Sequence, residues 1–436
     1  MDDTSSPIST NSGPDAYTGG GGRSHRILIV LFLIYMSDYA DRMVVSSMID
    51  FIKRDWHITD AQAGWLISVV VLFITVFTIP AAILIDRWSR RKMVALMTFF
   101  WSIATLACAF TKNYTQLIIT RAFIGIGESG YAPGGSAMIA AAYPEKDRAK
   151  YMGIWNASIP LGVGIGLAAG GLIAKRWGWH HAFGIVALPG MLLAIAAWYL
   201  PDYKSVRPED SATGLGEDRG FSGFIKQSMG ILRIPSLTCT YLGFAMNVSA
   251  TTALMTWLPT YFERVGKAEP GKGGVYSSAL FALVLIGAPL GGYLSDILQR
   301  KHKKARMIFP AVSSVAATIL LYVSFLNIDK PYALGLLALY GITVTCFVAP
   351  GAAVTQDVVH PGLRAFSYGM CVIVQHVLGD IWSPPLIGKI SDMIGLENAV
   401  LFVPVYGALG AVFFLIGSRF YERDLSRVEK VQLQAE

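Results

Sequence analysis

The sequence is poor in charge and in cysteine. Only 15% of its 436 residues are Asp, Glu, Lys or Arg, and its four cysteines have neither disulfide nor metal-ligand spacing. The motifs H-E-x-x-H, G-x-S-x-G and the phosphate-binding Walker A run do not occur. These absences argue against a disulfide scaffold, a zinc site, a hydrolase and an ATP-driven pump. We therefore expect neither an enzyme nor a bound metal or cofactor.

The N-terminal region has no secretory signal peptide. Residues 1–22 are polar and rich in Gly and Ser, and they lack the basic segment that begins such a peptide. Segments of this composition bury too little apolar surface to fold. We interpret residues 1–26 as a disordered cytoplasmic tail and residues 422–436 as a second, charged cytoplasmic tail.

Hydrophobic residues make up 53% of the chain, and they are gathered in long blocks. A helix of about 20 apolar residues crosses the roughly 30 Å hydrocarbon core of a bilayer. Barrel strands would alternate apolar and polar residues, and these blocks do not. We predict an all-α membrane protein with twelve spans, at residues 27–50, 63–86, 93–111, 115–141, 150–174, 181–200, 234–262, 275–297, 307–326, 332–357, 366–390 and 398–420.

The basic residues are gathered in alternate loops. Clusters follow the second, fourth and eighth expected spans, whereas the opposite loops are shorter and more balanced. Because Lys and Arg concentrate in cytoplasmic loops, this asymmetry puts both chain ends in the cytoplasm. It also accounts for the positive net charge, so no nucleic-acid partner is expected. The clusters contain Arg87, Arg90, Arg91, Lys92, Lys146, Arg148, Lys150, Arg300, Lys301, Lys303, Lys304 and Arg306.

The expected spans fall into two halves that resemble each other. A polar stretch at residues 201–233 reads as a cytoplasmic linker between bundles at 27–200 and 234–421. An acid followed by a basic run occurs in both halves, at Asp86 and at Asp296. Two pseudo-symmetric six-helix bundles imply a midplane site reached alternately from either side. A receptor or a channel stays open as an alternative, but the repeat favours alternating access.

The acidic and basic residues of these repeated loops suggest a gate. Asp86 with Arg87 and Arg91, and Asp296 in the second half, could pair with a neighbouring helix end and latch one access state. The alternative is a set of charges that only fixes topology.

In the fifth span, Gly162, Gly166 and Gly170 predict close helix packing, with a smooth surface for rocking between bundles as a second possibility.

Charged residues inside expected spans carry the most functional information. Asp38, Asp41 and Arg42 lie in the first span, and Arg121 and Glu128 lie in the fourth. A charge at the bilayer centre costs about 2.5–3.5 kcal/mol on insertion scales, so such residues usually face a cavity and pair. We expect Asp38, Asp41 and Glu128 to carry protons, and Arg42 and Arg121 to bind an anionic group. A static buried ion network is the alternative.

The second half offers fewer charges. His376 and Asp380 are spaced i,i+4, which suits a titrating pair or a plain packing hydrogen bond. Asn247 and Thr251 lie in the seventh span, where they could line the opposite wall of the site. We therefore include Asn247, Thr251 and His376 among the candidate substrate-binding residues.

The two-halved layout resembles the major facilitator superfamily. Within it, the first half is similar to the Spinster lipid transporters, through Asp38-Tyr39-Ala40-Asp41-Arg42, through residues 86–92 and 120–129, and through Ile159-Pro160-Leu161-Gly162. Ala82 and Ser89 depart from the loop motif, where glycines are usual. The resemblance implies the major facilitator fold, a lysophospholipid or sphingoid phosphate as substrate, and proton linkage through Asp41, Arg42 and Glu128, with a role for Arg121.

Two transport functions remain in competition. The first is a proton-coupled carrier of an amphipathic lipid, and the second is a proton-coupled symporter of hydrophilic organic anions such as sugar acids. An acyl chain needs an apolar cavity wall, and the Met, Phe and Val content of the first, second, seventh and eighth spans favours the lipid. We expect a monomer in a bacterial inner membrane, with protons and the bilayer as its other partners.

Overall fold

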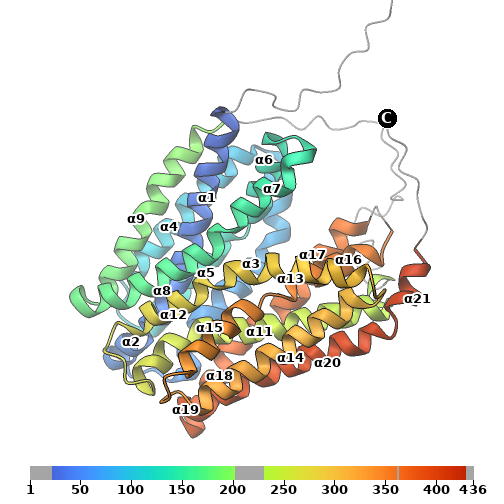
Figure 1. The fold of residues 1–436 in the computed structure, drawn as a ribbon. Coiled ribbons are helices and arrows are strands. Elements are labelled where there is room, and N and C mark those ends of the chain that lie inside the picture. Colours follow the sequence, from blue (N-terminus) through green and yellow to red (C-terminus); the bar gives the residue numbers. More distant parts are fainter. Residues whose placement is uncertain (1–21, 202–229, 361–362, 429–436) are drawn as a thin grey trace, which may run out of the picture.

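The computed structural model describes residues 22–201, 230–360 and 363–428, and this part of the chain is helical, without a strand (Figure 1). The all-α prediction is confirmed. The first group of helices comprises α1 (Gly22–Met43), η1 (Val44–Ser47), α2 (Ile49–Trp56), α3 (Asp60–Arg87), α4 (Arg90–Cys108), α5 (Tyr114–Glu128), α6 (Tyr131–Ala142), α7 (Glu145–Asn156), α8 (Ser158–Trp177) and α9 (Trp179–Trp198).

The second group follows the undescribed residues 202–229, on which most of the predicted linker falls. It comprises α11 (Pro235–Arg264), α12 (Gly273–Ala282), α13 (Val284–Gln299), α14 (Ala305–Leu326), α15 (Ala333–Thr343), α16 (Val348–Asp357), α17 (Arg364–Gln375), the π-helical turn η3 (His376–Asp380), α18 (Ser383–Ile394), α19 (Leu396–Ala399), η4 (Val400–Phe402), α20 (Val403–Ser418) and α21 (Tyr421–Ser426).

Several predicted boundaries were wrong. Helix α1 begins at Gly22, inside the expected tail, and α21 occupies the start of the other tail. Some expected spans are also interrupted, for example between α5 and α6 and between α7 and α8. Pro133 and Pro160 stand just after these interruptions. Proline has no N–H for the carbonyl four residues earlier, and its ring clashes with that carbonyl, so the helix breaks there.

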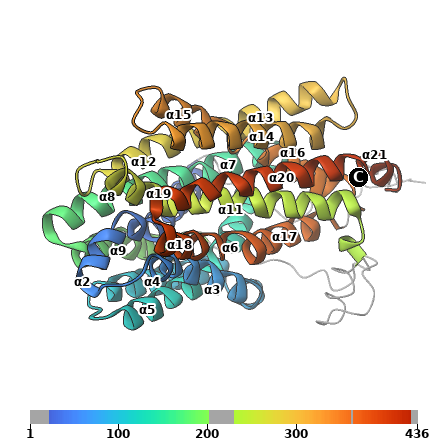
Figure 2. The ribbon, with the colours of Figure 1, turned by 90° about the horizontal axis from the view of Figure 1, so that it is seen from below.

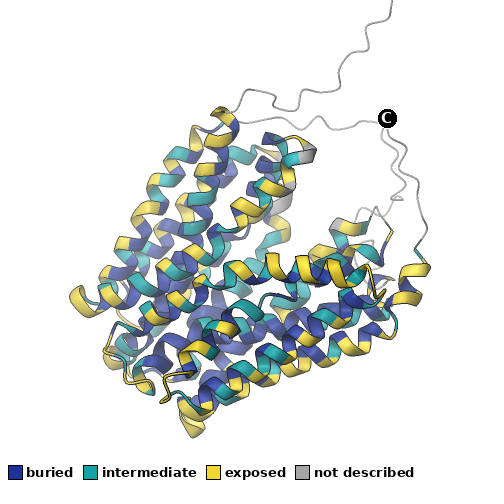
Figure 3. Cartoon of the chain, in the orientation of Figure 1, coloured by how far each residue is buried: buried dark blue, intermediate teal, exposed yellow. Residues whose placement is uncertain are grey.

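Nine helices among the described residues are long and apolar enough to cross a membrane. The three other expected spans correspond to α1, to α5 with α6, and to α11. Charged residues lower the apolar character of α1, the break divides α5 from α6, and α11 is rich in Ser and Thr. Large apolar side chains stay exposed, such as those of Val76, Leu192 and Val312. Exposed residues recur along the helices of both groups (Figure 3). A soluble protein rarely exposes so much apolar surface, whereas lipid covers it readily.

Packing within each group is close. Helix α4 packs on α9 and α1 on α8 in the first group, and α11 and α14 both pack on α20 in the second. At the contact between α1 and α8, a Cβ on Gly162, Gly166 or Gly170 would lie 2.3–2.5 Å from a backbone or hydroxyl oxygen of α1 and η1. The predicted packing role of these glycines is therefore confirmed. They face α1 of their own group, and a sliding surface between groups would have to lie elsewhere.

The substitution Gly166→Ala should destabilise the protein, because its Cβ would lie 2.5 Å from the carbonyl oxygen of Ala40 in the neighbouring helix. Overpacking of this kind costs about 1–3 kcal/mol. The thermal unfolding midpoint in detergent measures the loss. Gly153→Ala is the matched control, since a Cβ at Gly153 has no neighbour within 4 Å. Equal melting of the two variants would contradict the packing argument.

The two groups meet mainly through α8 with α12 and through α3 with α18. The views in Figures 1 and 2 both place α12 beside α8. We use "far end" for the end that carries the α2–α3, α8–α9, α11–α12 and α18–α19 connections, at the lower left of Figure 1. From there the groups diverge toward the ends of α6, α7, α16 and α17 (Figure 1).

Candidate substrate and proton site

The charges of α1 and α5 come together around Arg42. Its Nη2 lies 2.9 Å from Oδ2 of Asp38, and its Nε lies 2.7 Å from Oε2 of Glu128. The pair Asp38–Arg42 follows from the i,i+4 spacing on α1, which places both side chains on one helix face. Glu128 reaches the same guanidinium from α5. One arginine therefore bridges two carboxylates from two helices.

Exposure differs sharply within this triad. The side chains of Asp38 and Glu128 are both 0% exposed, whereas that of Arg42 is 16% exposed. The guanidinium also lies over the ring of Tyr39, at 4.7 Å from the ring centre. A cation over an aromatic face is held there by the ring quadrupole. The arginine is thus the member of the triad that a ligand can reach.

Aromatic residues behind the triad were missed by the sequence reasoning. Tyr35 packs edge-on against Tyr39 and stacks on Trp155 of α7, with ring centres 4.7 Å apart in the stacked pair. Tyr131, at the start of α6, donates its hydroxyl to the carbonyl of Leu31. The i,i+4 spacing of Tyr35 and Tyr39 on the face of Arg42 was the available signal. These rings fix α1, and with it the position of Arg42.

Arg121 lies beside the triad without joining it. Its side chain is completely buried, and Nη2 donates to the carbonyl of Arg42 over 3.2 Å, while Nε donates to the carbonyl of Leu66. The last carbonyls of a helix have no partner inside the helix. In this structure Arg121 therefore holds the end of α1 and joins it to α3. A contact between Arg121 and a substrate stays a prediction.

Asp41 is separated from Arg42 although the two are adjacent in sequence. It is fully buried, and the polar side chains around its carboxylate are those of Trp101 and Thr105 in α4 and of Arg121 in α5. Successive residues of a helix point about 100° apart, so Asp41 points toward α4 while Arg42 points toward Glu128.

The pair predicted for the second half, His376 with Asp380, is present in the structure. Nδ1 of His376 lies 2.9 Å from Oδ2 of Asp380 on the π-helical turn η3, and the two side chains are 24% and 10% exposed. π-Helical turns inside α-helices are frequent at functional sites. Gly379 between them packs on the carbonyl of Ala245 in α11. The roles predicted for this turn stay predictions.

Asn247 and Thr251 form hydrogen bonds within α11 and with α14. The amide of Asn247 is buried, donates to the carbonyl of Gly243 over 2.9 Å and accepts the Ser314 hydroxyl over 3.0 Å. Thr251 donates to the carbonyl of Asn247. The bond with Ser314 joins α11 to α14, so the structure does not bring Asn247 to the triad. The substrate contacts expected of Asn247 and Thr251 stay predictions. The sequence could not show which face of the polar-rich α11 points inward.

The predicted gating residues lie in or beside the connecting loops. The side chains of Asp86 and Arg87 are outside the described residues. Arg91 donates to the carbonyl of Leu200 over 2.9 Å, and Asp296, 66% exposed, lies 3.5 Å from Arg306. Arg91 and Asp296 therefore contact their own group of helices here. A gating role for these four residues stays a prediction.

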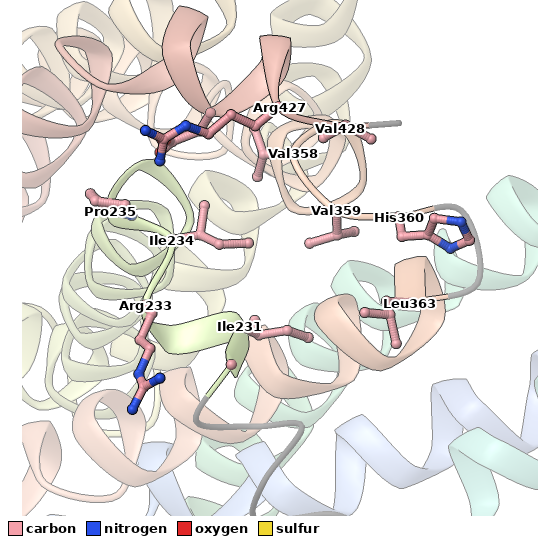
Figure 4. Close-up of a pocket in the computed structure, with 12 residues that line it drawn as sticks. Ile231, Arg233, Ile234, Pro235, Val358, Val359, His360, Leu363, Arg427 and Val428 are labelled. Atoms are coloured by element: carbon pink, nitrogen blue, oxygen red, sulfur yellow. The ribbon is translucent and has the colours of Figure 1, made fainter. Parts of the chain in front are cut away.

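One cavity of about 590 Å³ lies at the end of the second group opposite the far end (Figure 4). Apolar side chains from the segments before α11 and before α17 surround it, and two arginines also line it. None of the predicted site residues lines it. The cavity is therefore separate from the triad; its labelled lining includes Ile231, Arg233, Ile234, Val359, Leu363 and Arg427.

Comparison with known proteins gives related sequences along nearly the whole chain. The chain is 29% identical over 440 residues to protein spinster homolog 1 of Xenopus tropicalis, covering 92% of this chain and 82% of that protein. It is 26% identical over 434 residues to the sphingosine-1-phosphate transporter SPNS2 of the same species, covering 91% of this chain and 82% of that protein.

The fold is also that of a solved transporter. A bacterial homologue of the human lysosomal transporter Spinster, crystallised in an inward-facing and unoccupied conformation, superposes with a TM-score of 0.82 at 21% identity, covering 93% of this chain and 99% of that one. The profile of the Major Facilitator Superfamily matches residues 31–384. This chain is an integral, multi-pass membrane transporter, not an enzyme, and it belongs to the major facilitator superfamily, with the Spinster proteins among its relatives.

Proposed function

We propose that this transporter is a proton-coupled carrier of an amphipathic, lipid-like anion, of the lysophospholipid or sphingoid phosphate class. Alternating access between bundles at 27–200 and 234–421 would expose the site to each side in turn. Arg42 binds the anionic head group, and Asp38, Asp41 and Glu128 carry the proton. The observation that supports this most is the position of Arg42, partly exposed yet held between two fully buried acids.

The chemistry follows from competition for one guanidinium. An anionic head group and the carboxylate of Glu128 both suit the fork of Arg42. A proton on Glu128 removes the competitor and leaves Arg42 free for the ligand. Asp41 is a second buried acid, and an ionised carboxylate is costly in such a place. Loading of a proton and loading of a substrate are thereby linked.

The lipid class rests on the relatives and on the surroundings of Arg42. One relative is named a sphingosine-1-phosphate transporter, a carrier of a long-chain phosphate. Around Arg42 the neighbours from α1, α6 and α7 are Tyr35, Tyr39, Tyr131 and Trp155. Tyr35, Tyr131 and Trp155 are buried behind the triad, so the partly exposed ring of Tyr39 is the one of these four that can offer apolar surface to a chain beside Arg42. We further propose a monomer in a bacterial inner membrane, with both termini in the cytoplasm.

Transport in proteoliposomes tests the proposal. The purified protein is reconstituted, and uptake of a labelled lysophospholipid, a sphingoid phosphate and a sugar acid is compared with and without a pH gradient. We expect lipid movement that a pH gradient accelerates. Equal lipid movement at every gradient would contradict proton coupling, and gradient-driven uptake of the sugar acid alone would replace the lipid class with that of hydrophilic anions.

A further inference from the structure

A charge cluster at the far end links the two groups of helices. Asp60, the first residue of α3, is 3% exposed. Its Oδ2 accepts from Nη1 of Arg264 over 2.8 Å, and its Oδ1 accepts from Nη2 over 3.0 Å, so the guanidinium holds the carboxylate with two parallel bonds. Lys53 lies 2.5 Å from Oδ1, and the Ser391 hydroxyl donates to Oδ2 over 2.6 Å. Paired bonds of this kind are among the stronger polar contacts.

Arg264 extends this link to a second acid. It is the last residue of α11, and its Nη2 lies 2.5 Å from Oδ1 of Asp50 in α2. Its side chain is 27% exposed, so the contact is only partly screened by solvent. A single arginine of the second group thus holds two acids of the first group.

A second contact runs in the opposite direction. Asp392 of α18 accepts the backbone N–H groups of Asp60 and Ala61, over 2.7 and 2.9 Å. The first N–H groups of a helix have no partner within the helix, and the helix dipole favours an anion there. The start of α3 in the first group is therefore capped by an acid of the second group.

Close backbone contacts also join the two groups of helices at the far end. A Cβ on Gly388 would lie 2.4 Å from the carbonyl oxygen of Asp60, and one on Gly64 would lie 2.5 Å from that of Pro384. Between α8 and α12, a Cβ on Gly171 would lie 2.7 Å from the carbonyl oxygen of Gly271. The groups approach this closely because glycines stand at the contacts. Separation of the far end must break these contacts together with the ion pairs.

We propose that Asp60, Arg264 and Asp392 form a latch that holds the far end of the transporter closed. The proposal rests on alternating access, as proposed above, since an access change must part the groups at this end. From the sequence, a latch was expected only in the loops at the other end, those that carry Asp86 and Asp296. These contacts stabilise only the state in which the far end is closed. Breaking them therefore shifts the equilibrium toward the separated state by the free energy that they contribute.

Distances between spin labels across the far end test the latch. Labels are placed at Lys112→Cys and Glu397→Cys, two exposed positions in different groups, after the four native cysteines are replaced. We expect Arg264→Gln to raise the ratio of separated to closed molecules by at least about fivefold, the lower limit of ordinary coupling. Lys175→Gln is the matched control, because it removes the exposed Lys175–Glu269 pair at the same end, and such pairs contribute little.

A second variant covers the case in which Arg264→Gln does not fold. Gly388→Ala keeps every charge but adds a methyl group 2.4 Å from the backbone of Asp60, and it should also enlarge the separated population. Unchanged distances in whichever of these variants folds would overturn the latch. The spin labels report the distance between the two groups of helices without any substrate. A failure of the latch is therefore seen separately from a failure of proton-coupled transport, which is measured on the unmodified protein.

Discussion

Replacing Arg42 by Gln should reduce transport at least about 30-fold. The variant removes the group proposed to bind the anionic head, and loss of one member of a buried, hydrogen-bonded charge pair costs about 2–5 kcal/mol, with a tenfold change for each 1.4 kcal/mol. It also leaves the carboxylates of Asp38 and Glu128 buried without their shared partner. Substrate uptake in proteoliposomes measures the first effect, and the unfolding midpoint in detergent measures the second.

A triple variant separates binding from folding. In Arg42→Gln with Asp38→Asn and Glu128→Gln, the two buried acids become neutral groups of nearly the same shape, so no unpaired charge remains. We expect this variant to melt closer to the unmodified protein while uptake stays low. If the triple variant regains full transport together with its stability, Arg42 only joins helices, and the proposed head-group contact is wrong.

Neutralising the proposed proton carriers should flatten the pH dependence of transport. The double variant Asp41→Asn with Glu128→Gln mimics two protonated acids and leaves Asp38 as the remaining proposed carrier, so a change in pH alters the charge around Arg42 less than in the unmodified protein. A coupling free energy of about 1–3 kcal/mol is usual, which corresponds to a 5- to 150-fold change in affinity that the double variant would lose. The pH dependence is measured as substrate uptake at several pH values, with the same substrate gradient at each.

The single variants should differ from each other. Glu128 contacts Arg42 directly, so Glu128→Gln removes a competitor and should raise substrate affinity most at alkaline pH. Asp41 does not contact Arg42, so Asp41→Asn should change the pH response with less effect on affinity. Glu397→Gln is the control, because the same chemical change at an exposed residue should leave the pH profile alone. A stable double variant with an unmodified pH response would refute the proton role of both acids.

The local features of the candidate site were predictable from sequence. The regular rise and turn of a helix decide that Asp38 and Arg42 share one face, and likewise His376 and Asp380, and both pairs occur in the structure. The cost of charge in hydrocarbon also directed attention to Glu128, which lies on Arg42. Such inferences need only the geometry of a single helix and the properties of the bilayer.

Choices between partners were not predictable in the same way. Asp41 was expected to act with Arg42, yet Arg42 binds Asp38 and Glu128, and Asp41 points toward Trp101 and Thr105 of α4. Arg121 bonds to backbone carbonyls, and Asn247 turns toward Ser314. Each outcome depends on how a helix is rotated against its neighbours, which is set by the packing of many side chains at once.

The sequence by itself determined that the chain is an all-helical membrane protein, because long apolar blocks can satisfy their backbone in lipid only as helices or as closed barrels, and the blocks lack barrel alternation. Only the tertiary structure decided which charges meet and which end of the molecule is closed. Arg264 and Asp60 are 204 residues apart, and Asp392 and Ala61 are 331 apart. No local period relates positions at such separations, so their contacts arise only when the two groups of helices pack together.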